Sequence, residues 1–312
     1  MKFPKRLCEH LNLAKELVQK GEISRFPIAY SDKIGFSEKI NSNDSGDRIL
    51  VTNGDRIVTG FDNQKSLYRN DLYVHYNNGI DPDFLIGVQL FLPLVFMPLI
   101  HKERPFIMAH MAQTLDGKIC TNSGRSKWIG NEENLKHAHR LRAMVDGVLV
   151  GGNTIANDLP KLSVRHVHGN NPTRLLLSNR FNDFDKLPDV PGMKTYVLRR
   201  KGNVVNKSYR TISEVIYYDG ETEADRIRDL LSKLKEAGIG SILLEGGSKT
   251  VTSFYKENNI DWLQLHIAPI IFGSGKSFIQ LSEINDVSEG RKLSNVFYNK
   301  MGDSIMVTGE LS

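Results

Sequence analysis

The segment from Leu243 to Thr250, with the sequence LLEGGSKT, constrains the fold of this chain more than any other feature. An apolar run beginning at Ser241 ends in two glycines, and residues with hydroxyl groups follow. Glycines allow a backbone to approach a ligand closely, and the free N–H groups of a helix's first turn favour an anion such as a pyrophosphate. The pattern therefore predicts a buried strand, a tight turn and a helix that bind an anionic group. The alternative is a turn that only needs small residues.

A second segment of the same design lies at Val150–Thr154, where an apolar run ends in Gly151 and Gly152. Neither segment matches the Walker A motif or the Rossmann glycine motif, so nucleotide binding cannot be inferred from those two motifs. Open α/β sheets bind ligands at the carboxyl ends of their strands. If both strands belong to one parallel sheet, the two turns lie at the same edge, which favours a dinucleotide.

After Pro105 the chain alternates between apolar strands and amphipathic helices, a pattern that indicates an α/β domain around a mainly parallel sheet. Asn131 is a good N-cap for the first helix. One side of this helix carries Leu135, Ala138, Leu141, Arg142 and Val145. The predicted helices cover 131–145, 222–238 and the residues after Gly247 up to about 258, and the predicted strands cover 106–113, 146–152, 174–178, 195–200, 241–247, 262–271 and 304–311.

Residues 1–103 lack this alternation and contain no catalytic motif, so we treat them as a separate N-terminal region of unknown fold. The most apolar stretch, 84–100, is shorter than the ~20 apolar residues that a bilayer requires and contains Gln89 and two prolines, so we expect it to be buried in protein. Other expected elements are a helix near 5–20, a polar loop over 37–47 and short strands within 48–53, 55–61 and 71–76.

Composition excludes several classes of protein. Hydrophobic residues make up 40% of the 312 residues and charged residues 25%, which suffices for a buried core. The only two cysteines, Cys8 and Cys120, cannot build a disulfide framework or a cysteine-rich zinc site. The ligand set of a zinc nucleobase deaminase is also missing. The net charge of +5 suits a phosphorylated substrate, a dinucleotide or nucleic acid equally well.

Several further motifs stand in order along the chain, namely Thr114-Leu115-Asp116-Gly117-Lys118-Ile119, Ser126-x-Trp128-Ile129, His139-Arg140-Leu141-Arg142-Ala143, Asp158-x-Pro160-x-Leu162-x-Val164-Arg165, Glu245-Gly246-Gly247, and Ala268-Pro269 with Gly273. In this order they resemble the C-terminal reductase domain of the bifunctional riboflavin-biosynthesis deaminase/reductase. The resemblance covers residues 104–312, about two thirds of the chain. It implies an α/β, dihydrofolate-reductase-like fold, in which a mainly parallel sheet is flanked by helices.

The resemblance also implies the reaction. The family's substrate is 5-amino-6-(5-phosphoribosylamino)uracil, whose opened sugar presents an imine at C1′ to hydride from a nicotinamide, and the product carries a ribityl chain. Two arginines are suitable ligands for its phosphate because guanidinium groups bind in a planar, bidentate manner. The residues that match the family's substrate-binding positions are Ser126, Arg142, Leu162, Arg165 and Glu245.

The cofactor implied by the resemblance is NADPH. No carboxylate follows the strand that ends at Ser178, and an acid after such a strand is typical of NAD enzymes. Asp158 is the candidate catalytic residue, as a proton donor or a holder of water, although it could instead orient its loop. Trp128 could instead pack in the core. The residues assigned to the cofactor are Ala112, Trp128, Thr154, Asp158, Ser178, Gly247, Ser248, Lys249, Thr250, Val251, Thr252 and Ser253.

We expect no metal site, because His137 and His139 are two positions apart on a predicted helix and His166 and His168 lack further ligands. We also expect a cytoplasmic homodimer without a nucleic-acid or membrane partner. Two alternatives stay open. One is a reductase of the same fold that acts on another pyrimidine or on a pterin, and the other is a non-catalytic module that binds nucleotides or nucleic acid. Scattered lysines and arginines do not favour nucleic acid.

Overall fold

The computed structural model describes residues 26–30, 47–53, 63–68, 72–76, 82–101, 103–205 and 211–311. The chain divides into two compact units, Met1–Leu99 and Ile100–Ser312, each described here by itself.

The first unit contains a four-stranded antiparallel sheet with the strand order β1-β2-β4-β3. The strands predicted within 48–53 and 71–76 are confirmed as β2 and β4. The helix predicted near 5–20, nearly all of the polar loop and the whole strand predicted at 55–61 lie outside the described residues. The strand bounds are β1 (Phe26–Tyr30), β2 (Asp47–Asn53), β3 (Asn63–Tyr68) and β4 (Leu72–Tyr76).

The apolar segment 84–100 lies within one helix, α2 (Pro82–Ile100). The side chains from Leu90 to Met97 are buried, which confirms the predicted burial for this part of the segment. Among the residues that the structure describes, no helix is both long and apolar enough to cross a bilayer.

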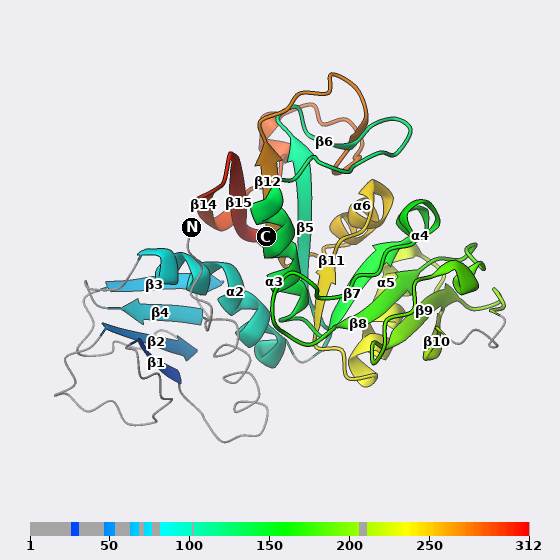
Figure 1. The fold of residues 1–312 in the computed structure, drawn as a ribbon, viewed down its shortest axis with the longest axis horizontal. Helices are drawn as coiled ribbons and strands as arrows, with labels where there is room; N and C mark the ends of the chain where they lie inside the picture. The colour runs from blue at the N-terminus through cyan, green and yellow to red at the C-terminus, as the bar shows by residue number, and fades with distance from the viewer. Residues whose placement is uncertain are drawn as a thin grey trace. The chain divides into compact units, whose positions relative to one another are not determined.

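The second unit is built on a nine-stranded sheet with the order β10-β9-β8-β7-β11-β5-β12-β15-β14 (Figure 1). The strands from β10 to β12 are parallel, and β15 and β14 extend the sheet in antiparallel fashion. The mainly parallel α/β architecture predicted from the sequence is therefore confirmed. The bounds are β5 (Phe106–Thr114), β7 (Gly147–Gly151), β8 (Thr173–Leu177), β9 (Thr195–Arg200), β10 (Glu214–Tyr218), β11 (Ser241–Leu244), β12 (Trp262–Ala268), β14 (Leu293–Met301) and β15 (Ser304–Leu311).

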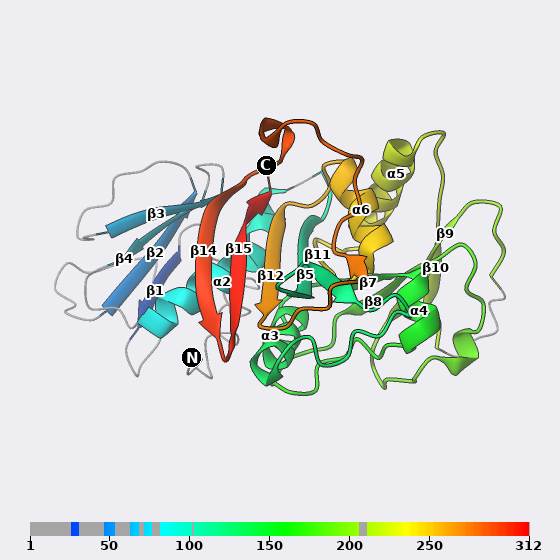
Figure 2. The ribbon, with the colours of Figure 1, turned by 90° about the horizontal axis from the view of Figure 1, so that it is seen from above.

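Helices cover both faces of this sheet, with α5 and α6 on one face and α3 on the other (Figure 2). The expected caps are present: the Asn131 side chain accepts from the Asn134 N–H at 2.8 Å, and α5 ends before Gly238. The elements are α3 (Glu132–Arg142), α4 (Gly152–Asp158), α5 (Glu223–Glu236), α6 (Ser248–Lys256), the 3-10 turns Phe184–Lys186 and Val287–Glu289, and a small two-stranded sheet of β6 (Lys118–Cys120) and β13 (Lys276–Ser277).

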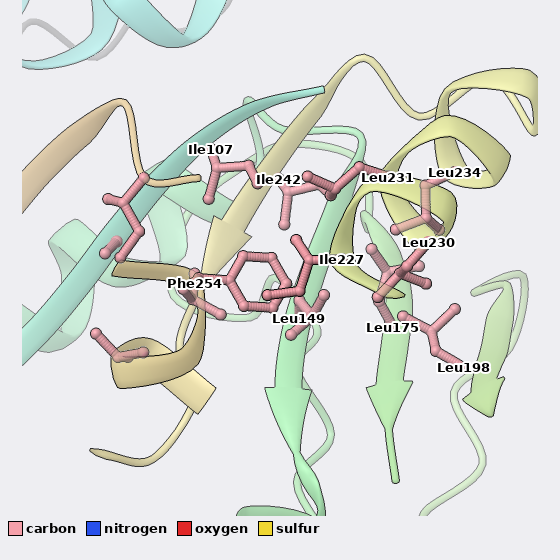
Figure 3. Packing of buried hydrophobic residues seen from close by; sticks show 14 of the residues in the cluster. Ile107, Leu149, Leu175, Leu198, Ile227, Leu230, Leu231, Leu234, Ile242 and Phe254 are labelled. Atoms are coloured by element: carbon pink, nitrogen blue, oxygen red, sulfur yellow. The ribbon is translucent and has the colours of Figure 1, made fainter. Parts of the chain in front are cut away.

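The apolar core lies between the sheet and the face that α5 and α6 cover. Ile227, Leu230, Leu231 and Leu234 follow one another at helical spacing and form the buried side of α5. Figure 3 shows them packed over strand residues, with Phe254 of α6 beside them. Burying a side chain of this kind contributes ~1.5–3 kcal/mol, so this face holds the parallel strands in place. The strand residues of the cluster include Ile107, Leu149, Leu175, Leu198 and Ile242.

The opposite face of the sheet is polar where α3 packs on it. On the side of α3 that the sequence marks, Leu141 is buried but Leu135 is 43% exposed, and the buried residues also include His137. The reason is that His137 meets His110 of β5 and His266 of β12, with ring centroids 5.5 and 6.5 Å away. His137 Nε2 also lies 2.6 Å from Gln264 Oε1.

Burial lowers the pKa of His110 from 6.5 to about 3 and that of His266 to about 4, and it lowers the pKa of His137 well below 6.5. All three rings are therefore neutral in the fold at neutral pH. The unfolded chain binds more protons at these sites than the folded chain between pH 6.5 and the folded pKa values.

Acid is therefore expected to destabilise the second unit. The free energy of unfolding should fall as pH drops from about 6.5 to about 4, by ~1.4 kcal/mol per pH unit for each neutral buried histidine. Urea unfolding at several pH values measures this slope. His110→Leu should reduce the slope by about one proton, whereas His168→Leu, on an exposed loop histidine, should not. An unchanged slope in His110→Leu would contradict the account.

Candidate active site

The two glycine-ended strands, β7 and β11, are neighbours in the sheet, with Leu244 of β11 opposite Leu149 of β7. Their turns touch because both strands run in the same direction and end at the same edge. A Cβ atom on Gly151 would lie 2.0 Å from Thr250 Oγ1, and one on Gly246 would lie 2.9 Å from Thr250 Cβ. These contacts are possible only because the two positions are glycines.

Both turns line one cavity of about 1030 Å³. Ordinary small-molecule pockets enclose about 300–1,000 Å³, so this cavity is large enough for a dinucleotide together with part of a second ligand. Its walls also include residues 156–158 of α4 and residues 178–181 after β8. The shared edge predicted from the sequence is therefore present in the fold.

The first turn of α6 is suited to an anion. No side chain caps it, because its N-cap is Gly247, and its first turn contains no acidic residue. Ser248 lines the cavity and is only 7% exposed, yet its hydroxyl oxygen has no hydrogen-bond partner among the described residues. Lys249 follows on the same cavity wall. Unsatisfied donors at a helix N-terminus, a buried hydroxyl and a nearby cation fit a phosphate or pyrophosphate.

Arg142 and Glu245 form a bidentate ion pair in the cavity wall. Arg142 Nε donates to Glu245 Oε1 at 2.8 Å and Nη2 donates to Oε2 at 2.6 Å. Burial opposes the charge of Arg142, but the adjacent Glu245 carboxylate outweighs it and raises the pKa of the arginine. The family resemblance assigned Arg142 to the substrate, whereas in the fold two of its five N–H donors bind Glu245 and a third contacts the Ser163 carbonyl at 3.4 Å.

The loop after α4 carries the other predicted substrate residues. Leu159 and Leu162 have φ values of 43° and 56°, a left-handed conformation that costs a non-glycine residue ~1–2 kcal/mol. Leu162 is buried and lines the cavity, whereas the Arg165 side chain is exposed and lies outside the described cavity lining. Desolvation and then the charge of Arg142 lower the pKa of Arg165, so the two guanidinium groups are close enough to interact.

Asp158 is the last residue of α4 and lines the cavity. Although part of its side chain is open to solvent, desolvation by the cavity walls raises the pKa of the carboxyl group, and the charge of Lys127 opposes this shift. Desolvation therefore favours the protonated form of this carboxyl group more than at an exposed aspartate, the direction that a proton donor needs.

Residues 178–181 form another part of the cavity wall and contain no carboxylate. Ser178 Oγ accepts from the N–H groups of Arg180 at 3.3 Å and Phe181 at 3.1 Å. Beneath this loop Arg199 is 1% exposed and donates to Asn179 O at 3.0 Å, to Asn182 Oδ1 at 3.1 Å and to the Phe181 carbonyl. The loop is therefore held from below, and Arg180 is exposed on the cavity wall.

The structure brings together most of the residues that the sequence assigned to the site. Trp128 is 90% exposed, which excludes core packing as its role. The predicted residues that line the cavity are Ser126, Arg142, Thr154, Asp158, Leu162, Ser178, Glu245, Gly247, Ser248, Lys249 and Thr250, and those outside its lining are Ala112, Trp128, Arg165, Val251, Thr252 and Ser253.

Sequence reasoning missed several residues of the cavity wall, namely Met111, Cys120, Arg180, Phe181, Tyr218, Lys276 and Gln280. Cys120 and Lys276 face each other across the pairing of β6 with β13, a contact between distant segments without a local sequence signal. Among the described residues no group of three or more His, Cys, Asp or Glu side chains is arranged to hold a metal ion.

The Thr114–Gly117 motif supports the site rather than lining it. Asp116 accepts from the Thr114 hydroxyl at 2.6 Å and from the N–H groups of Phe272 at 3.1 Å and Gly273 at 2.8 Å. The hydrogen bond from Thr114, followed by those from the backbone, lowers the pKa of Asp116 to about 2. This carboxylate therefore ties the end of β5 to the loop that leads from β12 to β13.

Comparison with known proteins agrees with this geometry. Residues 105–306 match the model of the RibD C-terminal domain. The riboflavin biosynthesis protein RibD of Aquifex aeolicus is 35% identical over 216 residues, which cover 68% of this chain and 59% of that protein. The 2,5-diamino-6-ribosylamino-4(3H)-pyrimidinone 5′-phosphate reductase of Methanothermobacter thermautotrophicus is 28% identical over 223 residues, 65% of this chain and 97% of that protein.

Among solved structures, a diaminohydroxyphosphoribosylaminopyrimidine deaminase/5-amino-6-(5-phosphoribosylamino)uracil reductase from Thermotoga maritima has a TM-score of 0.54 and 27% identity, over 72% of this chain and 60% of that one. The chain thus spans about 60% of the length of this structure and of the Aquifex relative. The similarity confirms the fold that the resemblance implies. This chain belongs to the RibD C-terminal domain family.

Proposed function

We propose that the cavity binds reduced nicotinamide dinucleotide and a phosphorylated ribosylamino-pyrimidine, and that the protein reduces the ribosyl side chain to the ribityl form. The main support for this proposal is that the turns at Gly151 and Gly247 line one cavity. In this cavity Ser248 has a buried hydroxyl without a hydrogen-bond partner among the described residues. Two relatives act, by their names, on substrates of this class.

The residues of the cavity have complementary tasks in this proposal. The α6 N-terminus, with Ser248 and Lys249, holds the pyrophosphate of the cofactor. Glu245 accepts hydrogen bonds from the N–H groups of the pyrimidine, and its bidentate ion pair with Arg142 holds the carboxylate in the cavity wall. Arg165 binds the substrate phosphate, since within the described part of the chain its guanidinium donates one hydrogen bond, to Ser163 Oγ at 3.0 Å, and has further donors for a ligand. Ser126 and Leu162 complete the substrate wall.

The proposed reaction needs a hydride and a proton. Opening of the ribosyl ring gives an imine, a C=N double bond between C1′ and the exocyclic nitrogen. A reduced nicotinamide, when bound in the cavity, would supply the hydride to C1′. Asp158, whose pKa is raised by desolvation, supplies the proton that the nitrogen takes up as the double bond becomes single. Holding the two reactants in line provides much of the rate enhancement.

We infer that NADPH is preferred over NADH. The cavity wall at 178–181 contains Arg180 and no carboxylate, so a 2′-phosphate meets a cation there instead of an acid. The family resemblance also supports a cytoplasmic homodimer that has neither nucleic acid nor a membrane as a partner.

The first experiment follows the loss of nicotinamide absorbance with purified protein and three substrates, namely the deaminated uracil, its 2,5-diamino counterpart and dihydrofolate. We expect turnover with at least one of the two ribosylamino-pyrimidine phosphates and none with dihydrofolate. Arg165→Ala should raise the KM for the pyrimidine at least about tenfold, since a charge-assisted hydrogen bond is worth ~1.5–3 kcal/mol, and should change the KM for NADPH much less. Equal damage to both constants would contradict the assignment of Arg165.

Cofactor choice is tested with Arg180→Gln. Loss of the cation should raise the KM for NADPH at least about tenfold and leave that for NADH nearly unchanged, because only NADPH has the 2′-phosphate. Arg228→Gln, which removes a 76% exposed arginine from α5, is the matched control and should change neither constant. Equal effects of Arg180→Gln on both cofactors would refute the proposed contact.

Cys120 offers a test of cofactor position. Its free, half-buried thiol lines the cavity, so alkylation with N-ethylmaleimide should abolish turnover. NADPH at 100 times its Kd should slow this inactivation by up to about a hundredfold through occupancy. Cys120→Ser should be resistant and Cys8→Ser should stay sensitive. Inactivation of wild type at an unchanged rate in saturating NADPH would place the cofactor elsewhere.

A further inference from the structure

His139 is a buried histidine at the end of α3 for which the proposed reaction has no use. Its side chain is 0% exposed, and its ring packs edge-on against that of His166, with centroids 4.6 Å apart. The N–H of Arg165 donates to His139 Nδ1 at 3.0 Å. Its Nε2 is buried and has no hydrogen-bond partner among the described residues.

The hydrogen bond determines the chemical state of the ring. A nitrogen that accepts an N–H donor has no proton of its own, so the ring is neutral and its single proton lies on Nε2. Burial, followed by the positive charges of Arg142 and Arg165, lowers the pKa of His139 to about 4, although Glu245 opposes the shift. The acceptor is therefore available throughout the neutral range.

The loop that His139 contacts needs an external support. Leu159 and Leu162 have left-handed backbones, which persist in non-glycine residues only when neighbouring contacts hold them. Arg142 Nη1 donates weakly to Ser163 O at 3.4 Å, and the Val164 N–H donates to Asn171 Oδ1 at 2.8 Å. The bond from Arg165 N to His139 is the contact that fixes the backbone at the residue whose side chain is the proposed phosphate ligand.

We propose that His139 is a positioning residue of the substrate site: its unprotonated Nδ1 holds the backbone of Arg165 and thereby sets where the Arg165 guanidinium meets the substrate phosphate. This inference rests on the proposed function, because it assigns His139 to the same substrate site. It predicts that substitution of His139 raises the KM for the pyrimidine only when both Arg165 and the substrate phosphate are present.

Three variants separate this role from a general structural one. In asparagine, Oδ1 occupies roughly the place of histidine Nδ1 and can accept the Arg165 N–H, whereas leucine fills the space without an acceptor. His139→Leu should raise the KM for the phosphorylated pyrimidine about tenfold or more and change the KM for NADPH little, and His139→Asn should restore much of the loss. His168→Leu, on an exposed histidine of the same loop, is the control and should leave both constants unchanged.

A double-mutant cycle gives the sharpest test. If His139 acts through Arg165, then His139→Leu combined with Arg165→Ala should be no worse than Arg165→Ala alone, and the penalty of His139→Leu should vanish with a substrate that lacks the 5′-phosphate. Additive effects, or an equal penalty with the dephosphorylated substrate, would overturn the proposal.

A measurement on the wild-type protein keeps the proposal testable if His139→Leu fails to fold. Nitrogen-15 NMR of the histidine rings should show the His139 signal, assigned with His139→Asn, as the neutral form with its proton on Nε2 at pH 7. A proton on Nδ1, or a charged ring, would overturn the inference. This NMR result does not depend on turnover. If the wild-type protein reduced no pyrimidine, the proposed function would be refuted, but the NMR spectrum would still show which nitrogen of His139 carries the proton.

Discussion

The close contact between the turn after β7 and the first turn of α6 is the constraint on which the rest of the site depends. Gly151 has no side chain, and a Cβ there would collide with Thr250. Because β7 and β11 are adjacent and parallel, their carboxyl ends and the elements that follow them share one edge. Because Gly151 and the N-cap Gly247 have no side chains, the N-terminus of α6 stays uncapped and open to the cavity.

The substrate residues around α3 and the loop after α4 are held by polar contacts, not by the close approach of small residues. Along its buried side, α3 carries His137 toward the sheet, and its last turn carries His139 and Arg142 toward the loop and Glu245. A polar face costs free energy unless its groups are paired, but it allows one helix to hold both the sheet and a strained loop. The apolar face under α5 supplies the stability that offsets this cost.

Elements with a strong local signal were predictable from the sequence. Apolar strands such as 241–244 and the capped helices appear where the pattern places them, and both glycine turns line one cavity. The buried side of α3 was not predictable, because Leu135 is exposed while His137 packs against His110 and His266 of two neighbouring strands. Strand β14, half exposed along its length, and the β6–β13 pairing, which brings Lys276 to the cavity, depend on contacts between distant segments.

Hydrogen–deuterium exchange with and without NADPH tests the shared cleft most directly. Amides at the two turns, 150–155 and 246–252, lie on the same cavity and should gain protection together as the cofactor saturates. Protection of one turn alone, or of neither in the presence of NADPH or NADH, would contradict the account, because a dinucleotide bound as inferred here contacts both.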